Sequence, residues 1–511
     1  MGSTSSPRTD QEQTKFNSEI QNGSLGKEGT PTEAQELKPS PFNVDHLSAP
    51  REALTVATVV FAQLLARAGL AQPIAPVNAP AETFGVANTI QTLWFPAAFS
   101  LTSGTFILVA GRIGDILGHK QLFCFGLVWY CLWSLLAGLS SFTHAVIFFD
   151  VCRAMQGIAA SILTPCGLAI LGSIYRPGPR KEKAFSIFAA AAPNGFVLGA
   201  VFASLLTERV SWPWAYYILA IACAGLAIVA VPTLPDLRRR DTLSSTPNHH
   251  KFDWLGCIVG VTGLILFNVA WNQAPSTGWG EPYVIVLLIL GILFFATFIF
   301  VEQRVTYPLV PVSSMSGETL FVLGSIALGW SSFGIWIYYL WKFLENLRGA
   351  TPLLATAEVL PGAVSGVVAA LMTGFLLGRV HKPYIMVAAE LAFCAGNIVV
   401  ATMPVAQLYW FQTFWSALIM PFGMDLSFPV ATVIMSNLVP REHQGIAAST
   451  IAATVDYSIS IGLGIAGTVE VNIADGNVLR GYRGAWYSAI GLSGAGVFLA
   501  ILHSWISKRK I

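Results

Sequence analysis

Charged and amide side chains stand inside long apolar runs of this 511-residue sequence. Arg67, Asp150, Arg153 and Asp456 all fall within such runs, and Gln156 follows Arg153 by three positions. An ionised group in hydrocarbon is costly, so each of these side chains should face a partner or a water-filled cavity. The chemistry that such residues offer is proton binding, ion pairing and recognition of a polar ligand.

Asp456 is the most central of the acids, roughly 16 Å into its apolar run at 1.5 Å per residue. Its carboxyl has two interpretations. The helical face could simply pack against another helix, or the buried carboxyl could carry a proton, because burial favours the neutral form. Asp425 and Glu390 are weaker proton candidates, since water reaches them more easily near the ends of their runs. The small and polar residues that share the face of Asp456 are Ser449, Ala453, Ser460, Gly464 and Gly467.

Two arginines also leave alternatives open. Arg153 could form a structural ion pair with Asp150, three positions earlier. Arg67 could extend its guanidinium to the membrane surface. It could instead face a cavity together with Gln63, in which case a substrate bearing a carboxylate or a phenolate is expected.

The composition demands many membrane-spanning helices. Of the residues, 54% are hydrophobic and 11% are charged, against roughly 25% charged residues in a soluble domain. The net charge of +2 gives no basic excess, so we expect no nucleic acid partner. Stretches long enough to cross a hydrocarbon core of about 30 Å occur at residues 50–73, 87–110, 121–140, 145–172, 183–206, 213–233, 254–272, 283–301, 319–341, 353–377, 384–401, 408–433, 445–468 and 485–506.

The distribution of Lys and Arg predicts the orientation. With the N-terminus placed inside, 22 of the 29 fall in segments on the inner side. Cytoplasmic loops carry such an excess, so both termini should be cytosolic. The plasma membrane is the expected location, with the vacuolar membrane as the alternative. The outer loops are assigned Arg209, Lys342, Arg348, Arg480 and Arg483.

The chain also looks duplicated. Residues 111–120 are echoed by residues 374–382, and residues 179–182 by residues 440–442, at nearly equal displacements. This predicts an all-α membrane protein of about 14 transmembrane helices, with two six-helix bundles and two inserted helices. The expected domains are a disordered cytosolic N-terminal tail (1–48), an N-terminal bundle (49–235), a linker with the two extra helices (236–315), a C-terminal bundle (316–507) and a cytosolic C-terminus (508–511).

Two short motifs make a resemblance specific. Residues 111–120 are similar to the cytoplasmic loop signature of the major facilitator superfamily, Gly-x-x-x-Asp-x-x-Gly-x-Arg/Lys, and residues 153–157 resemble its fourth-helix signature. The inserted pair resembles the fourteen-helix drug:proton antiporter branch. Within it, residues 63–65 and 271–275 are similar to fungal aminotriazole-resistance exporters, whose relatives include ammonium and borate carriers. The first motif contains Gly111, Arg112, Gly114, Asp115, Gly118, His119 and Lys120.

The resemblance implies roles for these residues. The loop would lock the two bundles together in the outward-open state, against the thirteenth helix after Pro440. The alternative is a solvated turn that obeys the positive-inside rule, and the echo carries Gly378 where Asp115 stands. Proton coupling is assigned to Asp150, Arg153 and Gln156 by resemblance, and to Asp456 by its position.

The fifth helix departs from the antiporter pattern Gly-Pro-x-x-Gly-Gly. Here Gly195 and Gly199 remain, but the proline stands at Pro193 and Ala200 replaces the last glycine. We still expect Pro193, Gly195 and Gly199 to form a hinge. Proton antiport is therefore less firmly indicated than the fold.

These features together predict a secondary active transporter, not an enzyme, that exports small organic molecules by alternating access with proton antiport. A monomer in the bilayer is expected, acting on a small molecule and protons, with no cofactor and no metal. Uptake of a small nutrient or ion, such as ammonium or borate, is the alternative, as is a non-transporting receptor on the same fold. The predicted cavity residues are Gln63, Arg67, Gln91, Trp94, Asn194, Trp330, Tyr338, Trp415 and Asp425.

Overall fold

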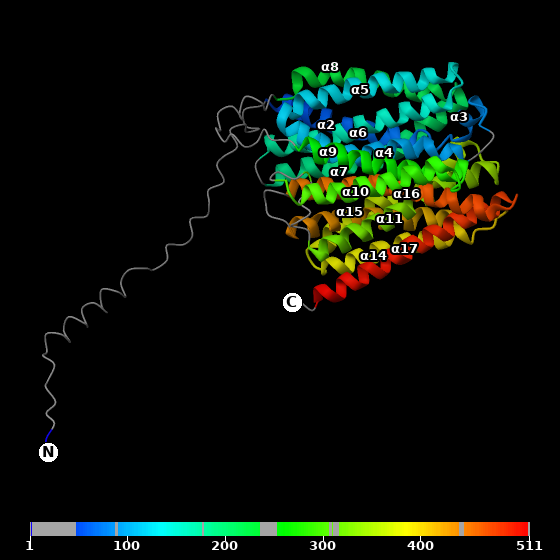
Figure 1. The fold of residues 1–511 in the computed structure, drawn as a ribbon. Helices are drawn as coiled ribbons and strands as arrows, with labels where there is room; N and C mark the ends of the chain where they lie inside the picture. The colour runs from blue at the N-terminus through cyan, green and yellow to red at the C-terminus, as the bar shows by residue number, and fades with distance from the viewer. Residues whose placement is uncertain are drawn as a thin grey trace.

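The computed structural model describes residue 2 and residues 48–86, 90–175, 178–235, 253–305, 309, 316–438 and 444–508. Within these residues, 14 helical segments are long and apolar enough to cross a membrane, the number expected from the sequence. They run side by side (Figure 1). We call the end where α2 starts and α17 ends the terminal face, and the end that carries α3 the distal face. Nearly all of the predicted N-terminal tail lies outside the described residues.

The first bundle contains six long helices and a short distal helix, α3 (Asn78–Thr83). A 3-10 turn, η2 (Gln91–Leu93), leads into its second long helix, and another, η3 (Ser140–Phe142), follows its third. The long helices are α2 (Ala49–Ala71), α4 (Trp94–Leu117), α5 (His119–Leu139), α6 (Val146–Ile174), α7 (Pro179–Arg209) and α8 (Pro213–Thr233).

The second bundle repeats this arrangement with one break. The predicted span 353–377 is divided into α12 (Pro352–Val359) and α13 (Pro361–Leu377), because a proline starts the second piece and cannot donate a helical hydrogen bond. The inserted pair is α9 (Trp254–Thr277) and α10 (Pro282–Glu302). The remaining helices are α11 (Gly317–Asn346), α14 (Lys382–Ala401), α15 (Gln412–Leu438), α16 (Gln444–Ala474) and α17 (Val478–Lys508).

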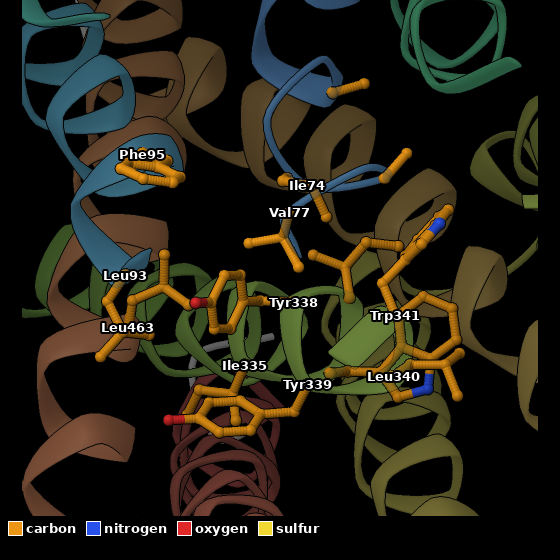
Figure 2. Close-up of a cluster of buried hydrophobic side chains, with 14 of the residues drawn as sticks. Ile74, Val77, Leu93, Phe95, Ile335, Tyr338, Tyr339, Leu340, Trp341 and Leu463 are labelled. Atoms are coloured by element: carbon orange, nitrogen blue, oxygen red, sulfur yellow. The ribbon is translucent and has the colours of Figure 1, made fainter. Parts of the chain in front are cut away.

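Apolar packing joins the two bundles on the distal side. One buried cluster combines residues of both bundles, whereas the other two large clusters each belong to a single bundle. Figure 2 shows Ile74, Val77 and Leu93 of the first bundle beside Tyr338 and Trp341 of α11. The bundles therefore share a core toward the distal face and keep separate cores toward the terminal face.

The inserted helix α9 bridges the two bundles by packing on both α4 and α16. The Asn272 amide on α9 donates to the Ser460 carbonyl at 3.2 Å, and the Tyr457 hydroxyl on α16 donates to the Leu264 carbonyl at 2.8 Å. Helix α10 packs mainly on α9. A Cβ added at Gly291 would lie only 2.7 Å from the Phe267 nitrogen, so this pair of helices is in close contact.

The helix bounds correct the charge assignment at one outer position. Lys342 was expected in a loop, but α11 continues to Asn346 and the Lys342 side chain is buried. Its ammonium lies 5.3 Å from the ring centre of Tyr338 and 5.5 Å from that of Tyr482. Aromatic faces attract such a cation. Helix ends beyond the apolar stretch cannot be located from hydropathy alone.

Two glycines of the predicted hinge in α7 allow its close contact with α2. A Cβ at Gly195 would overlap the Leu64 carbonyl oxygen, and one at Gly199 would overlap that of Ala68. The helix remains continuous through Pro193. The close packing expected here is present, and the hinge itself stays a prediction.

We expect Gly199→Ala to lower the thermal stability of the detergent-purified protein, because its new methyl group would collide with the α2 backbone. Overpacking of this kind costs about 1–3 kcal/mol. The matched control is Gly225→Ala on α8, where an added Cβ meets nothing within 4 Å. Equal melting temperatures for the two variants, measured by fluorescence-detected size exclusion after heating, would contradict this account of the α2–α7 contact.

Candidate functional site

An ion pair connects the two bundles inside the membrane-spanning region. The Arg67 guanidinium on α2 donates to Asp456 Oδ1 on α16 at 2.8 Å, and the side chains are 19% and 3% exposed. Ser103 Oγ on α4 donates to the other carboxylate oxygen at 2.6 Å. Both oxygens of Asp456 are therefore bound by residues of the first bundle.

This pair decides between the two interpretations of Arg67. Its guanidinium does not extend to the membrane surface but faces a carboxylate of the other bundle. Its charge is compensated within the protein, which weakens the expectation of an acidic substrate. Gln63 lies on the same helix, is buried, and accepts a hydrogen bond from Thr164 at 2.9 Å.

Arg153 lies fully buried in the first bundle and binds backbone carbonyls. It donates to the Phe95 carbonyl at 3.1 Å, to the Gly69 carbonyl at 2.7 Å and to the Gln156 side chain. The Gln156 amide in turn donates to Ser134 Oγ at 2.7 Å. Arg153 therefore ties α2 and α4 to α6.

The alternative ion pair between Arg153 and Asp150 is wrong for the described part of the chain. Asp150 makes no ion pair there, and its Oδ1 is buried without a hydrogen-bond partner. Helical spacing placed these residues one turn apart, but the guanidinium reaches α2 and α4 instead of turning back along its own helix. A role for Asp150, Arg153 and Gln156 in proton coupling remains a prediction.

The loop between α4 and α5 turns at Gly118, whose φ is +99°. His119 Nε2 lies 3.2 Å from Asp115 Oδ1, and the Asp115 side chain is 58% exposed. Gly114 is buried against His119, where a larger residue would collide with the imidazole. Of the other motif residues, Gly111 and Arg112 belong to the end of α4 and Lys120 to the start of α5.

The expected partner of this loop, the thirteenth helix, is α16, which begins at Gln444; residues 439–443, just before it, lie outside the described residues. Its duplicated counterpart, residues 374–382, lies between α13 and α14 as the symmetry predicts. The gating role of the loop stays a prediction.

A pocket enclosing about 660 Å³, part of it open, lies between α7 of the first bundle and α11, α12, α13 and α15 of the second. Four aromatic side chains dominate its wall: Phe196, Phe333, Trp336 and Trp341. Asp425 is the one ionisable residue among the described residues that line it. Pro193 of the predicted hinge also contributes to the wall.

Asp425 is the only predicted cavity residue that lines this pocket. Trp330 is adjacent, with its ring centre 5.4 Å from that of Phe333, and donates to Ser427 Oγ at 3.1 Å. The Tyr338 hydroxyl lies 2.5 Å from that of Thr92, on the distal side.

The other predicted cavity residues lie away from the pocket. Trp94 donates to Gln273 Oε1 of α9 at 3.2 Å, and Gln91 belongs to the short turn η2. Asn194 is exposed on α7 and donates to the Ala190 carbonyl within its own helix. Trp415 is 56% exposed on α15 and does not line this pocket.

The sequence prediction missed all four aromatic residues of the pocket wall. A usable signal existed, because Phe333, Trp336 and Trp341 recur on α11 at spacings that place rings along one side of a helix. Aromatic residues are frequent throughout this chain, so this spacing alone could not distinguish the pocket residues from the others.

Residues 56–341 match the family described as Major Facilitator Superfamily. This chain belongs to the Major Facilitator Superfamily. The loop signature at residues 111–120 and the Arg153 motif both fall within the matched region. As a transporter of this superfamily with 14 apolar helices, it is a multi-pass membrane protein that acts on small molecules, not an enzyme.

Characterised relatives match almost the whole transporter. It is 51% identical to the low affinity ammonium transporter of Saccharomyces cerevisiae, with 90% of both chains covered. It is 42% identical to the efflux pump terJ of Aspergillus terreus, covering 89% of this chain and 88% of that protein. The aminotriazole resistance protein of S. cerevisiae is 36% identical, with 90% and 86% covered. The resemblance to fungal drug-efflux members is confirmed.

Among solved structures, that of PepTSo, a POT family transporter, superimposes with a TM-score of 0.65 and covers 90% of this chain and 98% of its own. The two are 14% identical. This similarity supports the fold of the transporter.

We expect Arg67→Gln and Asp456→Asn each to lower thermal stability, because each leaves one charge buried without its partner, at a cost of about 3–5 kcal/mol. The double variant should recover most of the loss, since both charges are then removed. Melting of the four proteins in one detergent forms a double-mutant cycle. Additive losses in the double variant would show that the two side chains do not interact.

Proposed function

We propose that this transporter exports small aromatic or apolar molecules, neutral or carrying one positive charge, through the pocket between α7 and α11. The observation that carries the proposal is the composition of the pocket wall. Phe196, Phe333, Trp336 and Trp341 offer flat apolar surface, and Asp425 offers a single negative charge. Ligand sites of this kind combine a mostly apolar wall with a few polar groups that fix orientation.

The charge of the wall favours cations over anions. An aromatic ring attracts a positive charge at its face, and the Asp425 carboxylate attracts the same charge. No Lys or Arg belongs to the described pocket lining, so a carboxylate substrate would meet no complementary group. An amine or a heteroaromatic base fits this wall better than an acid.

Export is the direction proposed, as in the relatives that are named efflux pumps; the structure adds which side of the bundles is closed in this conformation. Several hydrogen bonds join the bundles across the distal side, among them Asn78 to Glu345 at 2.7 Å, Thr92 to Tyr338 at 2.5 Å, and Ser204 to Thr356 at 2.8 Å. With the terminal face in the cytosol, as the Lys and Arg distribution predicts, this conformation is closed toward the outside. Substrate would load from the cytosol and leave after these contacts break, in a monomer of the plasma membrane.

Proton antiport is assigned to the Arg67–Asp456 pair. Protonation of Asp456 would remove its negative charge and with it the attraction to Arg67, 2.8 Å away. Because this interaction spans the two bundles, its loss would favour a different arrangement of them. The Arg67–Asp456 pair would therefore link the binding of one proton to the transport of one substrate, inside the membrane.

Ammonium transport is the second candidate function. It is favoured by the 51% identical relative, whose name states ammonium transport. Asp425 offers ammonium the same negative charge that it offers a larger cation. The aromatic wall distinguishes the two, because ammonium has no apolar part that could be buried against so large an apolar surface.

The test uses proteoliposomes with an imposed pH gradient and four probes: tetraphenylphosphonium, aminotriazole, ammonium and benzoate. We expect gradient-dependent transport of tetraphenylphosphonium and aminotriazole, and little transport of benzoate. In Asp425→Asn, binding of the tetraphenylphosphonium cation should weaken roughly tenfold, about 1.4 kcal/mol. The matched control is Asp475→Asn, whose carboxylate lies on the distal surface in contact with Arg480. Transport of ammonium alone would favour the second candidate, and preferential transport of benzoate would contradict both.

A further inference from the structure

Glu390 is a buried acid that the proposed transport cycle does not use. It lies on α14, its exposed fraction is 0%, and neither carboxyl oxygen has a hydrogen-bond partner. The expectation that water reaches this residue easily is therefore wrong. Its position, eight residues after the start of the helix, is roughly 12 Å from the terminal end at 1.5 Å per residue.

Two glycines from other helices make room for this carboxyl group. A Cβ at Gly329 on α11 would lie 2.7 Å and 2.8 Å from the two oxygens of Glu390, and one at Gly496 on α17 would overlap Oε2. No larger residue fits at either position while the acid keeps its place. The carboxyl group is thus enclosed where three helices meet.

No charged group neutralises Glu390 in the described residues. On α11 no charged or titratable residue stands between Glu318 and Tyr338, and on α17 none stands between Tyr487 and His503. The other titratable groups of α14 are Lys382, Tyr384 and Cys394, and the adjacent α15 carries Asp425, which lines the pocket. None of these groups, and not His503 either, binds the Glu390 carboxyl.

We infer that Glu390 is a second proton-binding site of the transporter, which holds its proton in this conformation and releases it when α14 separates from α11 and α17. An ionised carboxylate without a partner is strongly disfavoured in such surroundings. Loss of the proton leaves a carboxylate that needs water, and water enters only if the three helices move apart. Protonation of Glu390 therefore favours the present conformation over the hydrated one, in the opposite sense to protonation of Asp456.

The enclosing helix also forms the pocket wall, which links proton and substrate. Gly329 and Phe333 lie one turn apart on α11, and Phe333 lines the pocket. A row of aromatic rings connects the two places, because Trp330 lies 6.2 Å from Phe393 of α14 and 5.4 Å from Phe333. Movement of α11 away from Glu390 would displace the aromatic wall. This inference rests on the proposed function for its role in transport, but not for the protonation itself.

The first experiment measures protonation without any substrate. Infrared spectra of the purified full-length protein are recorded as the pH is raised, for wild type and Glu390→Gln. We expect a carbonyl band of protonated carboxylic acids that persists above neutral pH in wild type and is weaker in Glu390→Gln, which lacks the contribution of Glu390. Glu281→Gln, at the exposed start of α10, is the matched control and should keep the band. A band of unchanged intensity in Glu390→Gln overturns the inference.

The second experiment tests coupling in proteoliposomes with tetraphenylphosphonium as the probe. Glu390→Gln mimics the protonated acid, so exchange of probe against probe should persist while accumulation driven by the pH gradient falls about tenfold. Unchanged gradient-driven accumulation overturns the role in coupling. Failure of every protein, wild type included, to move any probe contradicts the proposed function, and the infrared band still decides the protonation. If Glu390→Gln does not fold, Glu390→Asp should keep the band, and its loss there also overturns the inference.

Discussion

The ion pair between Arg67 and Asp456 is the constraint on which the arrangement of the two bundles depends. Water inside a bilayer is too scarce to solvate an isolated charge, so each partner stabilises the other only while the bundles stay in register. Ser103 donates to the other carboxylate oxygen, so both oxygens of Asp456 are bound by residues of the first bundle. The stripe of small residues along α16 then has a physical purpose. Gly464 and its neighbours allow α9 to approach closely beside the pair, where an added Cβ would lie 2.7 Å from the Trp271 carbonyl oxygen.

The contacts between the two bundles differ between the distal face and the terminal face. Toward the distal face the bundles share one apolar core and several hydrogen bonds, whereas toward the terminal face each bundle packs on itself. If the bundles separate on the distal side, the shared apolar surface and buried polar groups such as Glu345 and Tyr338 must change their surroundings at the same time. A substrate that fills the pocket touches α7 and α11 at once and can offset part of that cost. This makes closure of the pocket and opening of the distal side parts of one transition.

The sequence was sufficient for the number and order of the helices, because twenty-residue apolar stretches have few alternatives in a membrane protein. It was insufficient for contacts between helices. Arg67 and Asp456 are separated by 389 positions, and no local spacing indicates such a pair. Local spacing instead suggested Asp150 as the partner of Arg153, which binds carbonyl oxygens of other helices. Nor did the sequence show that Trp415 does not line the pocket, because hydropathy does not reveal the direction in which a side chain points on a helix that is apolar all round.

The two bundles differ in the charged residues that they contribute to the proposed cycle. Arg67 and Arg153 in the first bundle contribute positive guanidinium groups. Of the acids discussed above, Glu390 and Asp456 are carried by the second bundle, as is Asp425 at the pocket, whereas Asp150 with its buried Oδ1 belongs to the first. In the proposed cycle, the protons of Glu390 and Asp456 would act on the second bundle, and Arg67 and Arg153 of the first would supply fixed charges. In an exchange of a proton for a cation, the arginine charges of the first bundle would stay the same. Only the strength of its contact with the second bundle would change.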